Sequence, residues 1–228
     1  MGSPAPDLPG LAALDPEFWR ALCSVDPAES GFAPVAAMWG LMVVAMMLPS
    51  LMPALAVLED LGHARAAGPR AMPLFVTGYL IVWGTLALLG AALQLQLSRA
   101  GLLGADGTLL SRAASAGLLA LAGLYQFSSL KAACLSQCRA PLGFFLQHWA
   151  QGDRAMVAMG LRMGAVCAGC CWALMALAFV GGTMSLAFMG LATFIMFTEK
   201  LPGIGRWITR PLGVLLLLLA AGQLAGAF

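Results

Sequence analysis

Three cysteines lie within five residues of one apolar segment, in the run Cys167-Ala-Gly-Cys170-Cys171-Trp172. Spacings of three and four residues put their sulfur atoms on one side of a helix. Thiolates are soft ligands that favour Cu(I) or zinc over hard ions such as Mg²⁺. Gly164 and Gly169 would let a neighbouring helix approach this segment closely. Buried cysteines also serve as small apolar residues, so the cluster is either a soft-metal site or core packing.

A second pair, Cys134 and Cys138, is four residues apart and is therefore adjacent on a helix. Lys131 and Arg139 flank the pair, and nearby positive charge favours the thiolate, which is the form of cysteine that binds metals. The pair has three interpretations: metal ligands, a redox pair that cycles to a disulfide, or ordinary residues beside basic side chains that anchor a helix at the membrane surface.

Methionines repeat every four residues along the first apolar segment, at Met38, Met42 and Met46, and Met47 follows directly. Thioethers are also soft ligands that suit Cu(I), so Met42, Met46 and Met47 are candidate metal ligands. A methionine stripe is otherwise packing material. Pro49 and Pro53 should kink the same helix, and irregular backbone inside a membrane normally borders protein or a cavity.

Two further candidates carry oxygen or nitrogen. Glu199 ends the fifth apolar segment, where a carboxylate is costly without a partner and is therefore a site candidate. Its possible partners are Lys200, Lys131 and Arg162, and the alternative is a boundary ion pair that stops the helix. His148 lies beside Trp149 in an apolar connector, where it is either a nitrogen ligand or an interfacial histidine.

The composition indicates which elements must position these side chains. Of the 228 residues, 61% are hydrophobic and 10% charged, whereas soluble domains have about 45–50% and about 25%. A membrane span needs about 20 apolar helical residues. We therefore predict an all-α polytopic membrane protein, a bundle of about six transmembrane helices. The predicted segments are Pro34 to Leu58, Pro73 to Leu97, Leu109 to Leu130, Met156 to Val180, Thr183 to Phe197 and Trp207 to Phe228.

The chain divides into residues 1–31, an extramembrane N-terminal segment, and residues 32–228, the transmembrane helical domain. The first part is acidic and lacks the basic start of a signal peptide. Its Asp15-Pro16-Glu17 run predicts a short interfacial helix, after which Cys23 is an incidental thiol. Residues 140–149 are too few to span a membrane, so we expect a re-entrant or interfacial segment that covers a site. Gly181-Gly182 predicts a tight turn between the fourth and fifth segments.

The basic residues predict the orientation, because cytoplasmic loops are enriched in lysine and arginine. With the N-terminus outside, nine basic residues lie at inner loops or helix ends and three lie outside. We therefore expect both termini outside a bacterial inner membrane, with Cys134 and Cys138 on the reducing side. Scattered basic residues argue against nucleic-acid binding. The chain also lacks dinucleotide-binding, P-loop and zincin motifs.

These segments together resemble a bacterial domain-of-unknown-function family described as predicted metal-binding integral membrane proteins. The resemblance rests on Met38-Trp-Gly-Leu-Met-Val-Val-Ala-Met-Met-Leu-Pro-Ser50, Tyr125-Gln126, Leu130-Lys131, Cys134, Cys138-Arg139, Cys167 to Met175, and Glu199-Lys200. It covers Val35 to Lys200 and implies a multi-helix membrane fold with a metal site. Ser129 and Ser185 depart from the expected proline and asparagine, and Ser129 should leave the third helix straighter.

We interpret the chain as a copper-handling protein that binds, delivers or translocates Cu(I), with zinc as the alternative ion. A small soluble metal-binding protein on the outer face would be its partner, besides membrane lipid. The rival interpretation is a membrane thiol-disulfide oxidoreductase that uses Cys134/Cys138 and the Cys167–Cys171 cluster, and the third is a structural subunit. The sequence leaves enzymatic activity and oligomeric state open. It also leaves open whether there is one metal site or two. Cys167 lies ~16 Å into its membrane span, whereas Cys138 falls near the membrane boundary.

Overall fold

The computed structural model describes residues 31–63, 68–104, 106–183 and 185–226. Within these ranges the regular elements are helices, apart from an isolated β-bridge between Leu103 and Leu109. The predicted all-α class is therefore confirmed for the described part of the chain. The predicted N-terminal interfacial helix and Cys23 lie outside the described residues.

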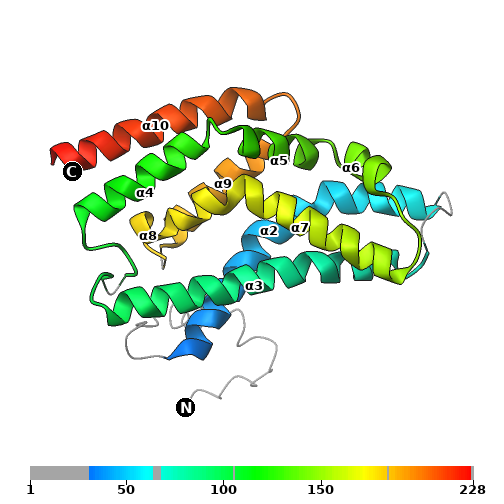
Figure 1. The fold of residues 1–228 in the computed structure, drawn as a ribbon, viewed down its shortest axis with the longest axis horizontal. Helices are drawn as coiled ribbons and strands as arrows, with labels where there is room; N and C mark the ends of the chain where they lie inside the picture. The colour runs from blue at the N-terminus through cyan, green and yellow to red at the C-terminus, as the bar shows by residue number, and fades with distance from the viewer. Residues whose placement is uncertain (1–30, 64–67, 105, 184, 227–228) are drawn as a thin grey trace, which may run out of the picture.

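The helices follow the predicted apolar segments closely, with breaks in the third and fourth. They are α2 (Phe32–His63), α3 (Ala71–Arg99), α4 (Arg112–Tyr125), α5 (Ser129–Arg139), α6 (Pro141–His148), α7 (Asp153–Ala176), α8 (Ala178–Gly181), α9 (Leu186–Lys200) and α10 (Gly205–Ala225). Figure 1 shows α3 and α7 lying side by side, and α4 beside α10.

Length decides how many of these helices can cross a membrane. Among the described residues, four are long and apolar enough: α2, α3, α7 continued through α8, and α10. The pair α4 and α5 makes a fifth if it is counted as one broken span. The 15 residues of α9 rise only about 22 Å, short of a hydrocarbon core of about 30 Å. The structure is consistent with a membrane protein, but it does not confirm six spans.

Glycines set the spacing of the central helix pair. A Cβ atom added to Gly160 of α7 would collide with the carbonyl oxygen of Phe75 in α3, and one added to Gly78 would collide with the carbonyl of Val157. Gly164 lies farther along α7, against Val82 of α3. The two helices therefore run in the same direction with their backbones in contact, as small residues permit in membrane proteins.

The third predicted span is broken, not straight. Between α4 and α5 the chain bends by 62°. Ser128 ends the break as the N-cap of α5, because its side chain accepts a hydrogen bond from the backbone N–H of Lys131. Ser129 is the first residue of α5, the position that proline favours in a helix. The expectation that Ser129 would leave this helix straighter was therefore wrong, since the serine cap starts a new helix without a proline.

Shorter features surround this core. Figure 1 shows α2 changing direction along its length, as its internal Pro49 and Pro53 predict. The connector after α5 forms α6, whose eight residues rise about 12 Å and cannot cross a membrane. Phe145 of α6 packs on Phe75 of α3, with ring centroids 5.4 Å apart. The predicted turn before α9 is present, with Gly182 at a φ of 92° that suits glycine.

Candidate metal centre

The three cysteines of α7 form a compact buried group. The sulfur atoms of Cys167, Cys170 and Cys171 all lie within 4.8 Å of one another. Each of these cysteines is at most 3% exposed. Helical spacing accounts for the shared face: the thiols of Cys170 and Cys171 donate to the carbonyl oxygen of Cys167 at 3.0 and 2.9 Å. The group therefore has the donor atoms and the proximity that a soft metal ion requires.

A fourth cysteine joins this group from another helix. The sulfur of Cys138, on α5, lies 3.9 Å from the sulfur of Cys170. After the 62° bend, α5 packs against α7, and Cys138 thereby reaches the level of the cluster. Cys138 and Cys170 therefore lie at the same depth, although the sequence had placed Cys138 near a boundary.

Cys134, one turn earlier on α5, has a different environment. A Cβ atom added to Gly169 of α7 would lie 2.7 Å from the sulfur of Cys134. Gly169 thus makes room for a neighbouring helix, as predicted from the sequence. Cys134 packs against the α7 backbone and is not one of the cysteines whose sulfurs form the compact group.

A thioether completes the set of sulfurs. The Sδ atom of Met47, on α2, lies 3.9 Å from the sulfur of Cys171, and the Met47 side chain is fully buried. Met42 and Met46 are buried on the same helix. They precede Met47 in the chain and lie nearer to the N-terminus of α2. Three helices, α2, α5 and α7, therefore bring sulfur atoms to one place.

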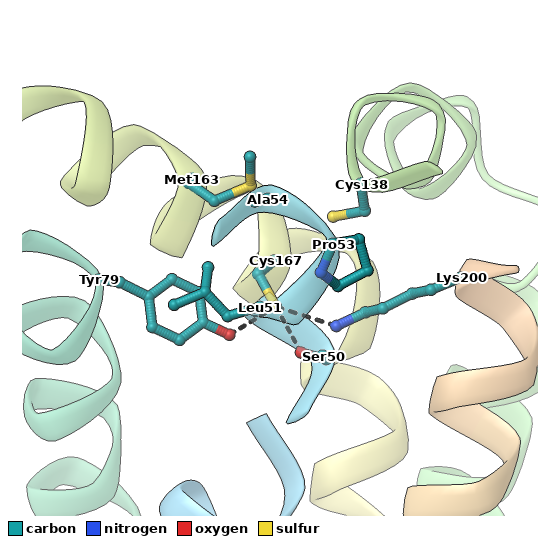
Figure 2. A pocket seen from close by; sticks show the side chains of 9 residues that line it. All are labelled: Ser50, Leu51, Pro53, Ala54, Tyr79, Cys138, Met163, Cys167 and Lys200. Carbon is teal, nitrogen blue, oxygen red and sulfur yellow. Dashed lines mark hydrogen bonds between the residues drawn. The ribbon is translucent and has the colours of Figure 1, made fainter. Parts of the chain in front are cut away.

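Cys167 is the cysteine with polar partners from other helices. Figure 2 shows Lys200, Tyr79 and Ser50 directed towards its sulfur, with Lys200 Nζ donating at 3.1 Å. The Tyr79 hydroxyl lies 3.2 Å from this sulfur and 3.1 Å from the carbonyl oxygen of Met47, so its one proton can go to either acceptor. Donors of this kind suit a thiolate, the form that binds metals.

A small cavity adjoins this sulfur. It has a volume of about 10 Å³ and its lining includes Cys167, Cys138, Met163, Tyr79 and Lys200. That is about the volume of one water-sized sphere. The cavity therefore provides space for a single small ion between sulfur atoms of two helices, and for nothing as large as an organic cofactor.

The structure gives the remaining predicted ligands other partners. Glu199 forms a buried ion pair with Lys131, with Nζ and Oε2 2.8 Å apart and both side chains at most 2% exposed. Its backbone carbonyl accepts a hydrogen bond from Arg139. The sequence had placed Lys131 beside the thiols of α5 and had also named it as a possible partner of Glu199. In the structure Lys131 neutralises Glu199, and the lysine at a thiol is Lys200. His148 contacts the Phe144 carbonyl through Nδ1 at 3.0 Å and also packs on the Phe144 ring.

Sequence reasoning missed four residues of this site, which are Tyr79, Lys200, Ser50 and Met163. From the sequence, Tyr79 is one residue of an apolar segment, and Lys200 is a candidate partner for Glu199 only. A signal for Tyr79 was available, because a tyrosine in the middle of a membrane helix needs a hydrogen-bond partner for its hydroxyl group. No local signal could identify the partner of Lys200, which lies 33 residues away in the sequence.

Comparison with known proteins identifies a matching protein family. A family model described as "PpoB2: Copper chaperone" matches residues 36–223. No curated protein and no solved structure matches the chain. The matched range includes each residue placed at the cysteine cluster, from Met47 to Lys200.

Proposed function

Since the chain belongs to the PpoB2 family of copper chaperones, we propose that it is an integral membrane protein that binds Cu(I) and passes it to a second protein. Cys167, Cys170 and Cys171 are the principal ligands, and Cys138 and Met47 complete the sulfur set. Zinc is the alternative ion, because sulfur donors also suit zinc. The copper ion is cargo in this proposal.

One observation carries the proposal: three buried sulfurs lie within 4.8 Å of one another, with two more sulfurs 3.9 Å from members of that group. Buried thiolates need compensating positive charge, because an unpaired charge is costly in a low-dielectric interior. Cu(I) supplies one positive charge and Lys200, at 3.1 Å from Cys167, supplies another. The donor set is therefore soft, and Cu(I) together with Lys200 offsets two of the three negative charges that the Cys167, Cys170 and Cys171 thiolates would carry.

Location and topology form part of the same proposal. We place the protein in a bacterial inner membrane with both termini outside, on the basis of nine inner against three outer basic residues. Six crossings are proposed, with the α4–α5 pair and the short α9 each counted as one. The recipient is a small soluble metal-binding protein at the outer face.

Metal analysis of the purified protein tests the proposal. Protein isolated without added metal should carry close to one copper ion per chain, and the double variant Cys170→Ala/Cys171→Ala should carry almost none. Met175→Leu on the same helix is the control, because a methionine-to-leucine exchange conserves volume. Zinc instead of copper would retain the site and refute the copper function. Absence of both metals would show that the cysteines serve only as packing residues.

One contact favours a second candidate function. Cys138 and Cys170 are free thiols on different helices with their sulfurs 3.9 Å apart. A small movement would allow them to close into a disulfide, in which the two sulfurs are about 2.05 Å apart. The oxidoreductase interpretation, in which the Cys134/Cys138 pair and the Cys167–Cys171 cluster exchange electrons, would therefore use Cys138 and Cys170 as the contact between them.

A further inference from the structure

A row of methionines leads along α7 to the cysteine cluster. Met156, Met159 and Met163 are spaced by three and four residues, and Cys167 follows four residues after Met163. All three methionines are buried, at 5%, 2% and 4% exposure. Residues at such spacings share one face of a helix. The thioethers therefore extend the sulfur-bearing face of α7 towards its N-terminus.

The row connects the cluster to a polar end of the bundle. Asp153 and Arg154, at the start of α7, are exposed, and Met156 lies within the first helical turn after them. With a rise of 1.5 Å per residue, the successive steps from Met156 to Met159, Met163 and Cys167 are about 4.5, 6 and 6 Å along the helix axis. An ion could pass between such positions by exchanging one sulfur ligand for the next.

Met163 provides the direct link to the site. It lines the cavity of about 10 Å³ together with Cys167 and Cys138. Figure 2 shows the three side chains around that cavity, with Met163 coming from α7 above Cys167. The innermost methionine therefore shares the ion-sized space with two of the cysteines.

We propose that Met156, Met159 and Met163 form a thioether path along which Cu(I) travels between the Asp153 end of α7 and the cysteine cluster. The inference rests on the proposed copper function. A thioether is a neutral soft ligand, so each step needs no proton to leave and holds the ion more weakly than a thiolate does. Such a path changes the rate at which copper arrives and leaves, and it leaves the final occupancy of the cluster unchanged.

Kinetics with a matched control test the path. Cu(I) is supplied as its bicinchoninate complex to metal-free protein in detergent, and loading is followed by the ultraviolet absorption of copper bound to thiolate. The double variant Met156→Leu/Met159→Leu, which leaves Met163 beside the cysteines unchanged, should load about tenfold more slowly, a barrier increase of about 1.4 kcal/mol, and should reach the same final copper content. Met175→Leu, on the far side of the cluster, should load at the wild-type rate.

The outcomes separate the path from the site. A wild-type loading rate in the double variant would overturn the path and leave the copper site intact. A lower final copper content would also overturn it, because the methionines would then be ligands of the cluster itself. If the wild-type protein itself takes up no Cu(I), the proposed copper function is refuted, and the path that rests on it is refuted as well. Slowing in the Met175→Leu control equal to that in the double variant would overturn the path and attribute the effect to helix packing.

Discussion

The Nζ atom of Lys200 lies 3.1 Å from the sulfur of Cys167. The preceding residue, Glu199, is buried against Lys131 of α5. Consecutive residues on a helix point in directions about 100° apart, so α9 directs one charged side chain to α7 and the other to α5. The end of this short helix therefore supplies a cation to the cysteine cluster and a carboxylate to a separate ion pair.

Removing the Lys200 charge should weaken copper binding. We expect Lys200→Met to lower the affinity for Cu(I) about tenfold or more, because a hydrogen bond to a charged group contributes about 1.5–3 kcal/mol. Competition with bathocuproine disulfonate measures the affinity. Lys200→Arg keeps the charge and should retain most of the binding. Equal affinity in Lys200→Met and the wild type would show that the lysine does not stabilise the bound state.

The two cysteines of α5 should behave differently. Cys138→Ser should reduce copper affinity, because its sulfur lies 3.9 Å from that of Cys170. Cys134→Ser, beside Gly169, should change the affinity little. In copper-loaded protein, maleimide should label Cys138 slowly, and a membrane-permeant chelator should accelerate the labelling. If dithiothreitol accelerates it and the chelator does not, the oxidoreductase interpretation is favoured.

Breaking the buried ion pair should destabilise the protein. Lys131→Met leaves Glu199 charged and unpaired, which typically costs about 3–5 kcal/mol in the free energy of unfolding. The double variant Lys131→Met/Glu199→Gln removes both charges and should recover much of that loss. Thermal unfolding in detergent compares the variants. A double variant no more stable than Lys131→Met would argue against an uncompensated charge as the cause.

The close contact of α3 and α7 should tolerate no side chain at Gly160. Gly160→Ala places a methyl group against the Phe75 carbonyl, so the helices must separate, at a cost of about 1–3 kcal/mol for overpacking. Copper occupancy should fall too, since Tyr79 reaches Cys167 from α3. The control is Gly190→Ala on α9, where an added Cβ meets nothing within 4 Å. Stability and copper content are measured together, and equal behaviour of the two variants would contradict this account.

The proposed orientation predicts the location of the C-terminus. Alkaline phosphatase fused after Phe228 should be active, because the enzyme requires the oxidising conditions outside the inner membrane. A green fluorescent protein fusion at the same position, exported unfolded, should be dark. Bright fluorescence with inactive phosphatase would reverse the topology and place the α5 cysteines outside.

Local periodicity and composition were sufficient for much of this description. The apolar segments predicted where the helices lie, because the backbone must satisfy its own hydrogen bonds within a membrane. The cysteine spacing predicted that Cys167, Cys170 and Cys171 share one face, since a helix of 3.6 residues per turn sets that relation by itself. The number of spans could not be read in this way, because the third segment breaks at Ser128 and α9 is short.

Contacts between helices were decided only by the tertiary structure. Met47 and Cys171 are 124 residues apart, and Cys138 and Cys170 are 32 residues apart, yet each pair of sulfurs lies at 3.9 Å. These distances depend on the depth and rotation of each helix relative to its neighbours. The glycine contact fixes the separation of α3 and α7, and the bend before α5 changes the direction of the helix that carries Cys138. A sequence gives the face of one helix, whereas a site between helices exists only once side-chain packing has fixed their relative positions.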